Sequence, residues 1–267
     1  MNPSSLKSPL IYPEPDGAPM AESDPARDYL IYGVEALKHY FNPRSDVYIS
    51  GNLWLSYEQG VPDAVVCPDV FVVFGVENRP RRSYRVWEEN NRIPDWILEV
   101  TSRSTHRTDE RDKPLLYAQM GVREYFQYDP SGDYLNPPLR GRRLVETEYE
   151  ILTPEELEGG MLSIPSQVLG LELRVLTDGR LRFFDSVSGE YLRSPEESEQ
   201  ERIQERIRAE QERIRAEQER IRAEQERIRA EQERIRAERE QLRAEDAERE
   251  LEQLRNLLRE RGINPDD

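Results

Sequence analysis

"PDWILEVTSRSTHRTDERDKPLLYAQMGVREYFQYDP", residues 94–130, contains two dense apolar runs separated by a polar, acid-rich segment. The run "DWILEVTS" is typical of a buried strand, and "REYFQYDP" is typical of a second strand that ends in a turn at Asp129-Pro130. Between them, "LLYAQMGV" predicts a short helix with Gly121 as its C-cap. Near-continuous apolar strands occur where both faces of a sheet are covered. The stretch therefore predicts a sheet with helices on both faces.

The segments upstream extend the same domain. "RDYLIYGVEALKHYF", residues 27–41, repeats apolar residues at helical spacing and predicts the first helix. Apolar residues alternate over residues 47–57, and Gly51-Asn52 interrupts the alternation as a bulge or tight bend. "DAVVCPDVFVVFGV", residues 63–76, predicts a strand that is buried on both faces.

The segments downstream complete the domain. Residues 131–193 give short strand-like pieces separated by Gly- or Pro-bearing turns. We therefore predict one α/β (α+β) domain over residues 27–193, built on a mixed β-sheet. Residues 1–26 are rich in Pro, Ser and Asp with few apolar side chains to bury, so we expect a disordered leader there.

From residue 194 the sequence changes to a heptad repeat. "ERIRAEQ" occurs four times in tandem over residues 205–232. One heptad position carries only apolar residues, which are Ile207, Ile214, Ile221, Ile228, Ile235 and Leu242. The position four residues later carries glutamine at Gln211, Gln218, Gln225 and Gln232. We predict a long charged helix over residues 194–262 with a weak coiled-coil seam, because the usual seam has two apolar positions per heptad.

The end of this helix has a better three-four apolar spacing in a different frame, at Ala244, Ala247, Leu251, Leu254 and Leu258. The tightest helix–helix contact is expected there. Two interpretations of the helix remain open: it makes homo-oligomers, or it is an extended charged helix that only solubilises the protein. Residues 263–267 are predicted to be a disordered tail.

Composition limits the classes of function. The chain carries a net charge of −16, which argues against the non-specific phosphate binding of basic nucleic-acid proteins. Cys67 is the only cysteine, so an intramolecular disulfide is impossible and a reducing compartment is natural. No run of eighteen apolar residues and no secretory segment is present. We expect a soluble cytoplasmic protein without a membrane partner.

Two carboxylates accompany the apolar strands. Asp69 follows Pro68 at the head of "VFVVFGV", and Glu99 lies inside "WILEV", on the strand face shared by Ile97 and Thr101. A carboxylate among apolar neighbours is costly unless it is paired or metal-bound. Two carboxylates suffice for Mg²⁺, which keeps several of its waters. The alternative to a metal site is that Asp69 is an acid in a turn at the strand end and that Glu99 is a buried acid paired with an arginine.

Several stretches together resemble a known family. "CPDVFVVFG", "ILEVTSRST", "DERDKPLLYAQMGVREYFQYDP" and the later "GLELRV" and "GRLRFFDSVSGEYL" are similar to the bacterial restriction endonuclease family often called Uma two, within the PD-(D/E)XK nuclease superfamily. The resemblance implies a restriction-endonuclease-like mixed β-sheet flanked by helices. It also implies a metal-dependent endonuclease that hydrolyses phosphodiester bonds in DNA with Mg²⁺ or Mn²⁺.

The resemblance also implies a catalytic set. The first Asp of the motif falls on Asp69 and its second acid on Glu99. The superfamily lysine usually follows that acid by two residues, where this chain has Thr101, and the resemblance places it instead on Lys113. Lys113 is one of only three lysines and the one nearest to clustered acids. Because Pro114 is tolerated only in a first helical turn, the helix is expected to begin close to Lys113.

Two further predictions concern the surroundings of this set. The resemblance suggests that Glu35, in the first helix, lies near the metal. Substrate contact is expected from residues 79–92, where arginines alternate with Tyr84 and Trp87; these are Arg79, Arg81, Arg82 and Arg85. A solvated hairpin tip is the alternative for this loop.

Two functions therefore remain open from the sequence. The first is a metal-dependent DNA endonuclease with a helical tail for oligomerisation. The second is a non-catalytic interaction or scaffold protein that uses the nuclease fold as a module and works through its coiled-coil helix. The sequence identifies neither the recognition sequence nor the number of chains in an assembly.

Overall fold

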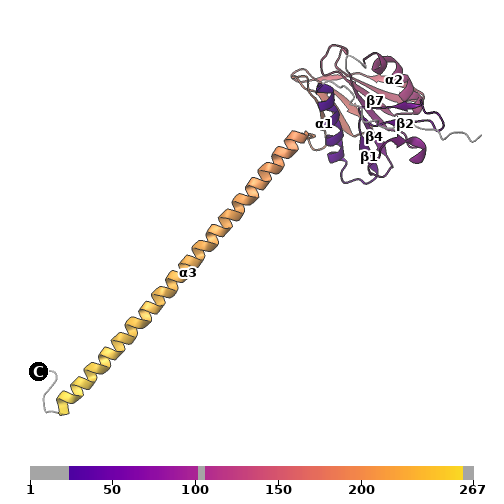
Figure 1. Cartoon of the computed structure of the whole chain (residues 1–267). Helices are drawn as coiled ribbons and strands as arrows, with labels where there is room; N and C mark the ends of the chain where they lie inside the picture. The colour runs from indigo at the N-terminus through magenta and orange to yellow at the C-terminus, as the bar shows by residue number, and fades with distance from the viewer. Residues whose placement is uncertain (1–23, 102–105, 261–267) are drawn as a thin grey trace, which may run out of the picture. The chain divides into compact units, whose positions relative to one another are not determined.

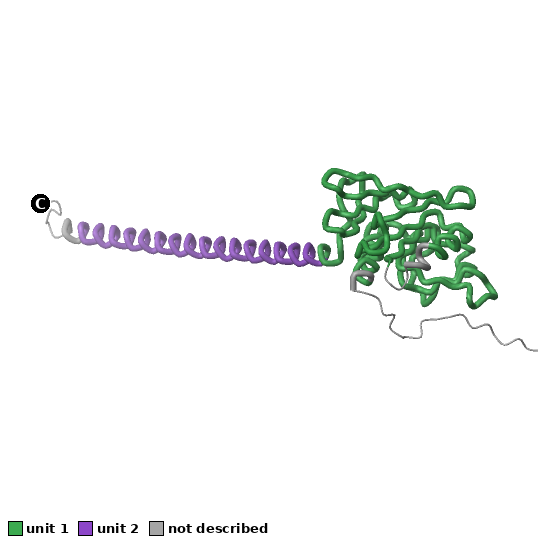
Figure 2. The backbone as a smooth tube through the Cα atoms, turned by 90° about the horizontal axis from the view of Figure 1, so that it is seen from above, with its two compact units in different colours: residues 1–198 green, residues 199–267 purple. Residues whose placement is uncertain are grey.

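The computed structural model describes residues 24–101 and 106–260 of the 267-residue chain. The chain divides into two compact units, residues 1–198 and residues 199–267 (Figure 2). The leader predicted over residues 1–26 lies outside the described residues except for its last three, which open the first helix, α1 (Asp24–Tyr40). The tail predicted over residues 263–267 lies outside them altogether.

A mixed six-stranded sheet forms the centre of the first unit (Figure 1). Its order is β1-β4-β6-β7-β8-β9, in which β6 and β7 are parallel and all other neighbours are antiparallel. The strands are β1 (Val47–Ser50), β4 (Val70–Phe74), β6 (Trp96–Val100), β7 (Glu124–Tyr128), β8 (Leu139–Val145) and β9 (Glu148–Leu152). The parallel pair requires a crossover, which is the helix α2 (His106–Met120). The strand, helix and strand predicted over residues 94–130 are thus confirmed.

Period two sorts the side chains of this sheet into two cores. Trp96, Leu98 and Val100 of β6 belong to one hydrophobic cluster, whereas Ile97 belongs to the other. Every residue of β6 and β7 is buried, as expected for strands covered on both faces. Glu99, one residue from the end of β6, therefore points to the face of Ile97, as its spacing predicts.

Helices lie on both faces of the sheet, as predicted, and each face is also covered by a further sheet, which the sequence did not predict. The face of Trp96 packs on α1 and on a second, five-stranded antiparallel sheet, because alternate residues along those strands are apolar and turn inward. That sheet contains β10 (Glu155–Leu157), β11 (Met161–Ser166), β12 (Leu171–Val175), β13 (Leu181–Asp185) and β14 (Glu190–Tyr191).

The face of Ile97 packs on α2 and on a small three-stranded sheet of order β3-β2-β5. These strands are β3 (Val65–Val66), β2 (Leu55–Ser56) and β5 (Tyr84–Arg85), and β5 runs into a short 3-10 helix, η1 (Val86–Glu88). Tyr84 of the small sheet and Tyr117 of α2 are both fully buried against this face.

The helix α2 departs from the prediction at its start. It begins at His106, so Pro114 lies in the interior of the helix and Lys113 lies one residue before it, not in a first turn. The proline has no N–H and costs one helical hydrogen bond. Contacts of Lys113 and Tyr117 with Glu99 hold the helix against the sheet on both sides of this defect. Gly121, with φ +91°, ends the helix as predicted.

The helix α3 (Pro195–Glu260) is a single element of 66 residues, about 100 Å long. Its isoleucines are half exposed, for example 46% at Ile207 and 50% at Ile221. Ion pairs between a glutamate and the arginine three residues later recur along it, as at Glu210–Arg213 and Glu217–Arg220. Among the helices of the described residues, none has the length and apolar character that crossing a membrane requires.

Candidate active site

Glu99 is the buried acid at the centre of the site. Its side chain is 1% exposed, and both of its oxygens are contacted from α2. The Tyr117 hydroxyl donates a hydrogen bond of 2.7 Å to Oε1, and Lys113 Nζ lies 3.0 Å from Oε2. A buried carboxylate is tolerated when a charge and hydrogen bonds compensate its lost hydration. The structure therefore brings Lys113 to the Glu99 carboxylate, fourteen residues earlier in the chain.

Asp69 lies directly before β4 and is half buried. The antiparallel register pairs Val70 with Leu98, so Asp69 and Glu99 are the next residues of the two neighbouring strands. The Asp69 Oδ2 atom accepts a hydrogen bond of 2.7 Å from the backbone N–H of Val100. The two carboxylates predicted from the sequence therefore occupy adjacent strand ends.

The bend at Gly51-Asn52 supports Asp69 from the other side. Asn52 has a positive φ of 50°, and its backbone N–H donates 2.9 Å to the carbonyl oxygen of Pro68. A Cβ atom on Gly51 would lie 2.1 Å from the backbone oxygen of Asp69, far closer than van der Waals contact. Only glycine lets the two segments pass this closely. The predicted bend is therefore part of the support of the site.

The hydrogen bond from Tyr117 to Glu99 was not predicted from the sequence. Tyr117 follows Lys113 by four residues, so both side chains lie on one face of α2. Burial, together with the nearby Glu99 charge, raises the pKa of the Tyr117 hydroxyl well above its usual value. The hydroxyl thus remains a hydrogen-bond donor over the working range of pH. Helical spacing from Lys113 was the available signal.

A polar pair on the neighbouring strands extends the site. Gln127 of β7 pairs in register with Glu99 and is fully buried. Its side-chain oxygen accepts a hydrogen bond from Arg142 of β8, and that guanidinium lies 5.6 Å from the ring centre of Tyr125. Arg142 therefore brings a cation to Gln127, the residue that neighbours Glu99 on the adjacent strand. The sequence did not predict it, because strand order cannot be read from periodicity.

The donor set fits a hard divalent cation. Asp69 and Glu99 supply carboxylate oxygens from adjacent strands on one face, and Mg²⁺ is usually held by one or two carboxylates together with water. Within residues 24–101 and 106–260, no cluster of three or more His, Cys, Asp or Glu side chains is placed to hold a metal. Two carboxylates on neighbouring strands are a donor set that fits a hard divalent cation whose remaining ligands are water.

Glu35 is not part of this pair of acids. It lies on an exposed position of α1, and its side chain, 54% exposed, forms an ion pair of 3.1 Å with Lys38. The neighbouring positions Val34 and Leu37 are the ones that face the core. The helical spacing that turns Leu37 inward turns Glu35 outward.

The arginines of residues 79–92 are largely engaged with acids of the same segment. Arg81 is almost fully buried, binds both oxygens of Glu89 and lies 4.1 Å from the ring centre of Tyr48. Arg79 also contacts Glu89, and Arg85 contacts Glu88. Arg82 is exposed, and the structure shows no ion pair for it among the described residues.

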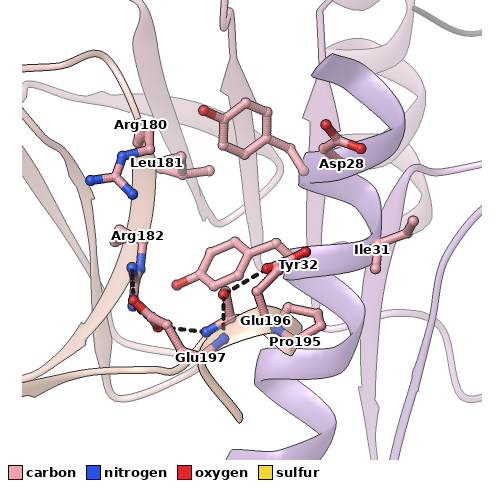
Figure 3. Close-up of a pocket in the computed structure, with 11 residues that line it drawn as sticks. Asp28, Ile31, Tyr32, Arg180, Leu181, Arg182, Pro195, Glu196 and Glu197 are labelled. Carbon is pink, nitrogen blue, oxygen red and sulfur yellow. Dashed lines mark hydrogen bonds and ion pairs between the residues drawn. The ribbon is translucent and has the colours of Figure 1, made fainter. Parts of the chain in front are cut away.

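A cavity of about 600 Å³ lies elsewhere in the first unit, between α1, β13 and the first turn of α3 (Figure 3). Arg182 makes two hydrogen bonds to the Glu197 carboxylate and one to the backbone oxygen of Leu192, beside the Tyr32 ring. None of the three predicted site residues lines this cavity. The Arg182–Glu197 contact fastens the start of α3 to β13, which is a structural role.

The mixed sheet, its helices and the paired strand-end acids define a restriction-endonuclease-like fold. The model of the Uma2 family, described as "Putative restriction endonuclease", matches residues 30–178. This covers more than half of the chain, which therefore belongs to that family.

Among solved structures, the chain is similar to a "putative nuclease belonging to DUF820" from Anabaena variabilis ATCC 29413. The two are 16% identical, with a TM-score of 0.40, over 57% of this chain and 76% of the other. No curated protein matches the chain.

Proposed function

We propose that this protein is a metal-dependent endonuclease that hydrolyses phosphodiester bonds in DNA. The observation that carries the proposal is the meeting of Asp69, Glu99 and Lys113 at the ends of β4 and β6. Membership of a family described as restriction endonucleases supports the same reaction class. Asp69 and Glu99 would hold Mg²⁺ or Mn²⁺, the ions whose ligand preference matches two carboxylates.

The residues of this chain have separate tasks in the proposed reaction. When bound, a divalent ion polarises the scissile phosphate and lowers the pKa of a bound water. The Lys113 ammonium orients the attacking water or offsets negative charge that develops on the phosphoryl oxygens. Tyr117 fixes the rotamer of Glu99 through its 2.7 Å hydrogen bond. Arg142 and the exposed Arg82 are the cations proposed to contact the DNA backbone.

Metal binding and cleavage on the full chain test the proposal together. Mn²⁺ is titrated calorimetrically into the parent, Asp69→Ala and Glu99→Gln, and each protein is then incubated with plasmid DNA and Mg²⁺. We expect saturable binding and cleavage by the parent, and loss of both in the variants by about 10²-fold or more.

Glu35→Gln is the matched control, since it makes the same chemical change at an exposed acid outside the site. It should bind metal and cleave like the parent. Equal cleavage by Glu99→Gln and the parent would contradict the assignment of the site.

We also infer that α3 makes homo-oligomers. Its support is the stripe of half-exposed isoleucines, which recurs once per heptad without an intrachain partner in the described part of the chain. An assembly would carry at least two candidate sites, which suits cleavage of both strands of a duplex.

The same stripe favours the second function, a non-catalytic scaffold that works through α3. Hydrogen exchange separates the two functions. A scaffold requires slowed exchange in residues 199–260 on self-association or on addition of a partner, with no metal-dependent change near Glu99. An endonuclease requires, in addition, that the metal ion slows hydrogen exchange near Glu99.

A further inference from the structure

The repeat in α3 has one heptad frame that suits a seam. With isoleucine at position d, glutamine occupies position a, as in Ile207 and Gln211. If isoleucine stood at a, the charged Glu210 would occupy position d of the seam in each repeat, at a high desolvation cost. Over residues 207–235 the Ile–Gln frame is therefore the one that places no charge in the seam, and each isoleucine in it is about half exposed in the single chain.

In this frame the positions that flank the seam carry opposite charges. Over residues 207–236 every g position is a glutamate and every e position an arginine; the glutamates are Glu210, Glu217, Glu224 and Glu231, and the arginines are Arg208, Arg215, Arg222, Arg229 and Arg236. In a parallel coiled coil, g of one helix faces e of the next heptad of its partner. Glu210 would then face Arg215 of the second copy, and the pattern repeats at each later heptad.

The antiparallel arrangement fails on the same positions. It places g against g and e against e, so that glutamate meets glutamate and arginine meets arginine. It also places position a against position d, which leaves the Gln211 amide against an isoleucine instead of another amide. Like charges and unpaired polar groups both act against that orientation.

The contacts within one helix leave four of the five e arginines of the repeat without an ion pair in the described part of the chain, whereas the fifth, Arg236, lies 3.3 Å from Glu240. The g glutamates pair with arginines three residues later, as at Glu210–Arg213. By contrast, among residues 106–260 the structure shows no ion pair at the e residues Arg208, Arg215, Arg222 and Arg229. These side chains lie exposed beside the isoleucine stripe.

We propose that α3 binds a second copy of this chain in the parallel orientation, through an Ile–Gln seam flanked by Glu–Arg contacts from g to e. This rests on the proposed self-association and is independent of nuclease activity. A consequence is that both copies of the first unit are attached at the same end of the paired helices, because residues 1–194 precede α3 in each chain.

Energy transfer between labelled full-length chains tests the orientation. Cys67→Ser removes the single native cysteine, and Glu199→Cys or Glu248→Cys adds one label. Both side chains are exposed, and the two positions are roughly 75 Å apart along α3. We expect transfer between two chains labelled at position 199 and between two labelled at 248, and none between 199 and 248. Transfer only in the mixed sample would overturn the parallel arrangement.

Sedimentation equilibrium on the same samples distinguishes the parallel orientation from the self-association of α3 on which it rests. A monomer at every concentration contradicts self-association itself, whereas an antiparallel oligomer contradicts only the orientation. The charge contacts are tested by Glu210→Gln, Glu217→Gln, Glu224→Gln and Glu231→Gln combined, which should raise the Kd about tenfold or more. Circular dichroism checks that the variant keeps its helix.

The matched control neutralises the four glutamates at the outward b positions, with the substitutions Glu212→Gln, Glu219→Gln, Glu226→Gln and Glu233→Gln. Its net charge equals that of the first variant, so a general charge effect would act on both. We expect the control to associate like the parent. Equal weakening of both variants would refute the g-to-e contacts.

Discussion

The Lys113 ammonium lies 3.0 Å from the Glu99 carboxylate, and both side chains are largely removed from water. Removing one partner of a buried ion pair leaves the other charge uncompensated. Lys113→Met should therefore destabilise the fold by about 3 kcal/mol and abolish cleavage. Urea unfolding and a cleavage assay measure the two effects.

The double variant Glu99→Gln with Lys113→Met removes both charges together. Its stability should recover most of the loss, because no isolated charge remains, while its activity stays absent. A double variant that is no more stable than Lys113→Met alone would show that the two residues do not form a pair.

Tyr117→Phe removes the hydroxyl that donates to Glu99 and leaves the buried ring in place. We expect a loss of about 1–2 kcal/mol in stability, typical of a hydrogen bond to a charged group. Cleavage should fall through kcat more than through KM, because the carboxylate loses its fixed rotamer. Tyr149→Phe, which removes a partly buried hydroxyl that donates to the Val122 backbone oxygen, is the comparison, and it should leave kcat unchanged.

Gly51→Ala tests the support of Asp69. The added Cβ would overlap the Asp69 backbone oxygen, so either the bend or the Asp69 segment must move. We expect a destabilisation of about 2 kcal/mol or more and a weaker affinity for Mn²⁺. Gly60→Ala is the control for metal affinity: its φ of +89° makes alanine strained, but the added Cβ would meet nothing within 4 Å, so the variant should lose stability and keep the Mn²⁺ affinity of the parent. An unchanged metal affinity in Gly51→Ala would argue against this role of the bend.

Pro114→Ala tests the helix that carries Lys113. Alanine restores a backbone N–H in the interior of α2, where proline lacks one. The variant should be more stable by about 1–3 kcal/mol, reduced somewhat because the unfolded chain gains freedom. A lower stability would contradict the account of Pro114 as a missing helical hydrogen bond.

Asp129 gives a prediction for pH. Burial alone would raise its pKa, but hydrogen bonds from Ser131, Tyr134 and Leu135 hold the pKa of the Asp129 carboxyl below its usual value. Its contribution to stability is therefore complete above the unfolded pKa of about 3.9 and is lost as the pH falls through the lower folded pKa. The stability gap between the parent and Asp129→Asn should close below about pH 4, as urea unfolding from pH 7 to pH 2.5 would show.

The sequence predicted the features that depend on periodicity and position along the chain. The alternation around Glu99 assigned its face, the apolar runs predicted the strands of the mixed sheet, and Gly121 marked the end of α2. These features are local, so a single sequence contains them. The resemblance to the family added the choice of Lys113, and the structure shows that side chain beside Glu99.

The features that the sequence did not predict depend on neighbours that are distant in the chain. The five-stranded sheet covers one face of the core because its strands alternate, yet alternation alone does not say which surface they cover. Arg142 reaches Gln127 only because β8 lies next to β7. The start of α2 was misplaced because the prediction applied only the local preference of proline for a first helical turn. In the structure, the contacts of Lys113 and Tyr117 with Glu99 compensate for the hydrogen bond that Pro114 lacks.

The tandem units of α3 make its length adjustable. Each "ERIRAEQ" unit carries its own isoleucine and a Glu–Arg ion pair with the arginine of the next unit. Adding or deleting one whole unit would change the length by about 10 Å and leave the apolar stripe unbroken, whereas any other insertion would rotate the later turns of the helix by about 100° per residue. The helix is thus a spacer that can be lengthened or shortened in steps of one unit without a change of partner surface.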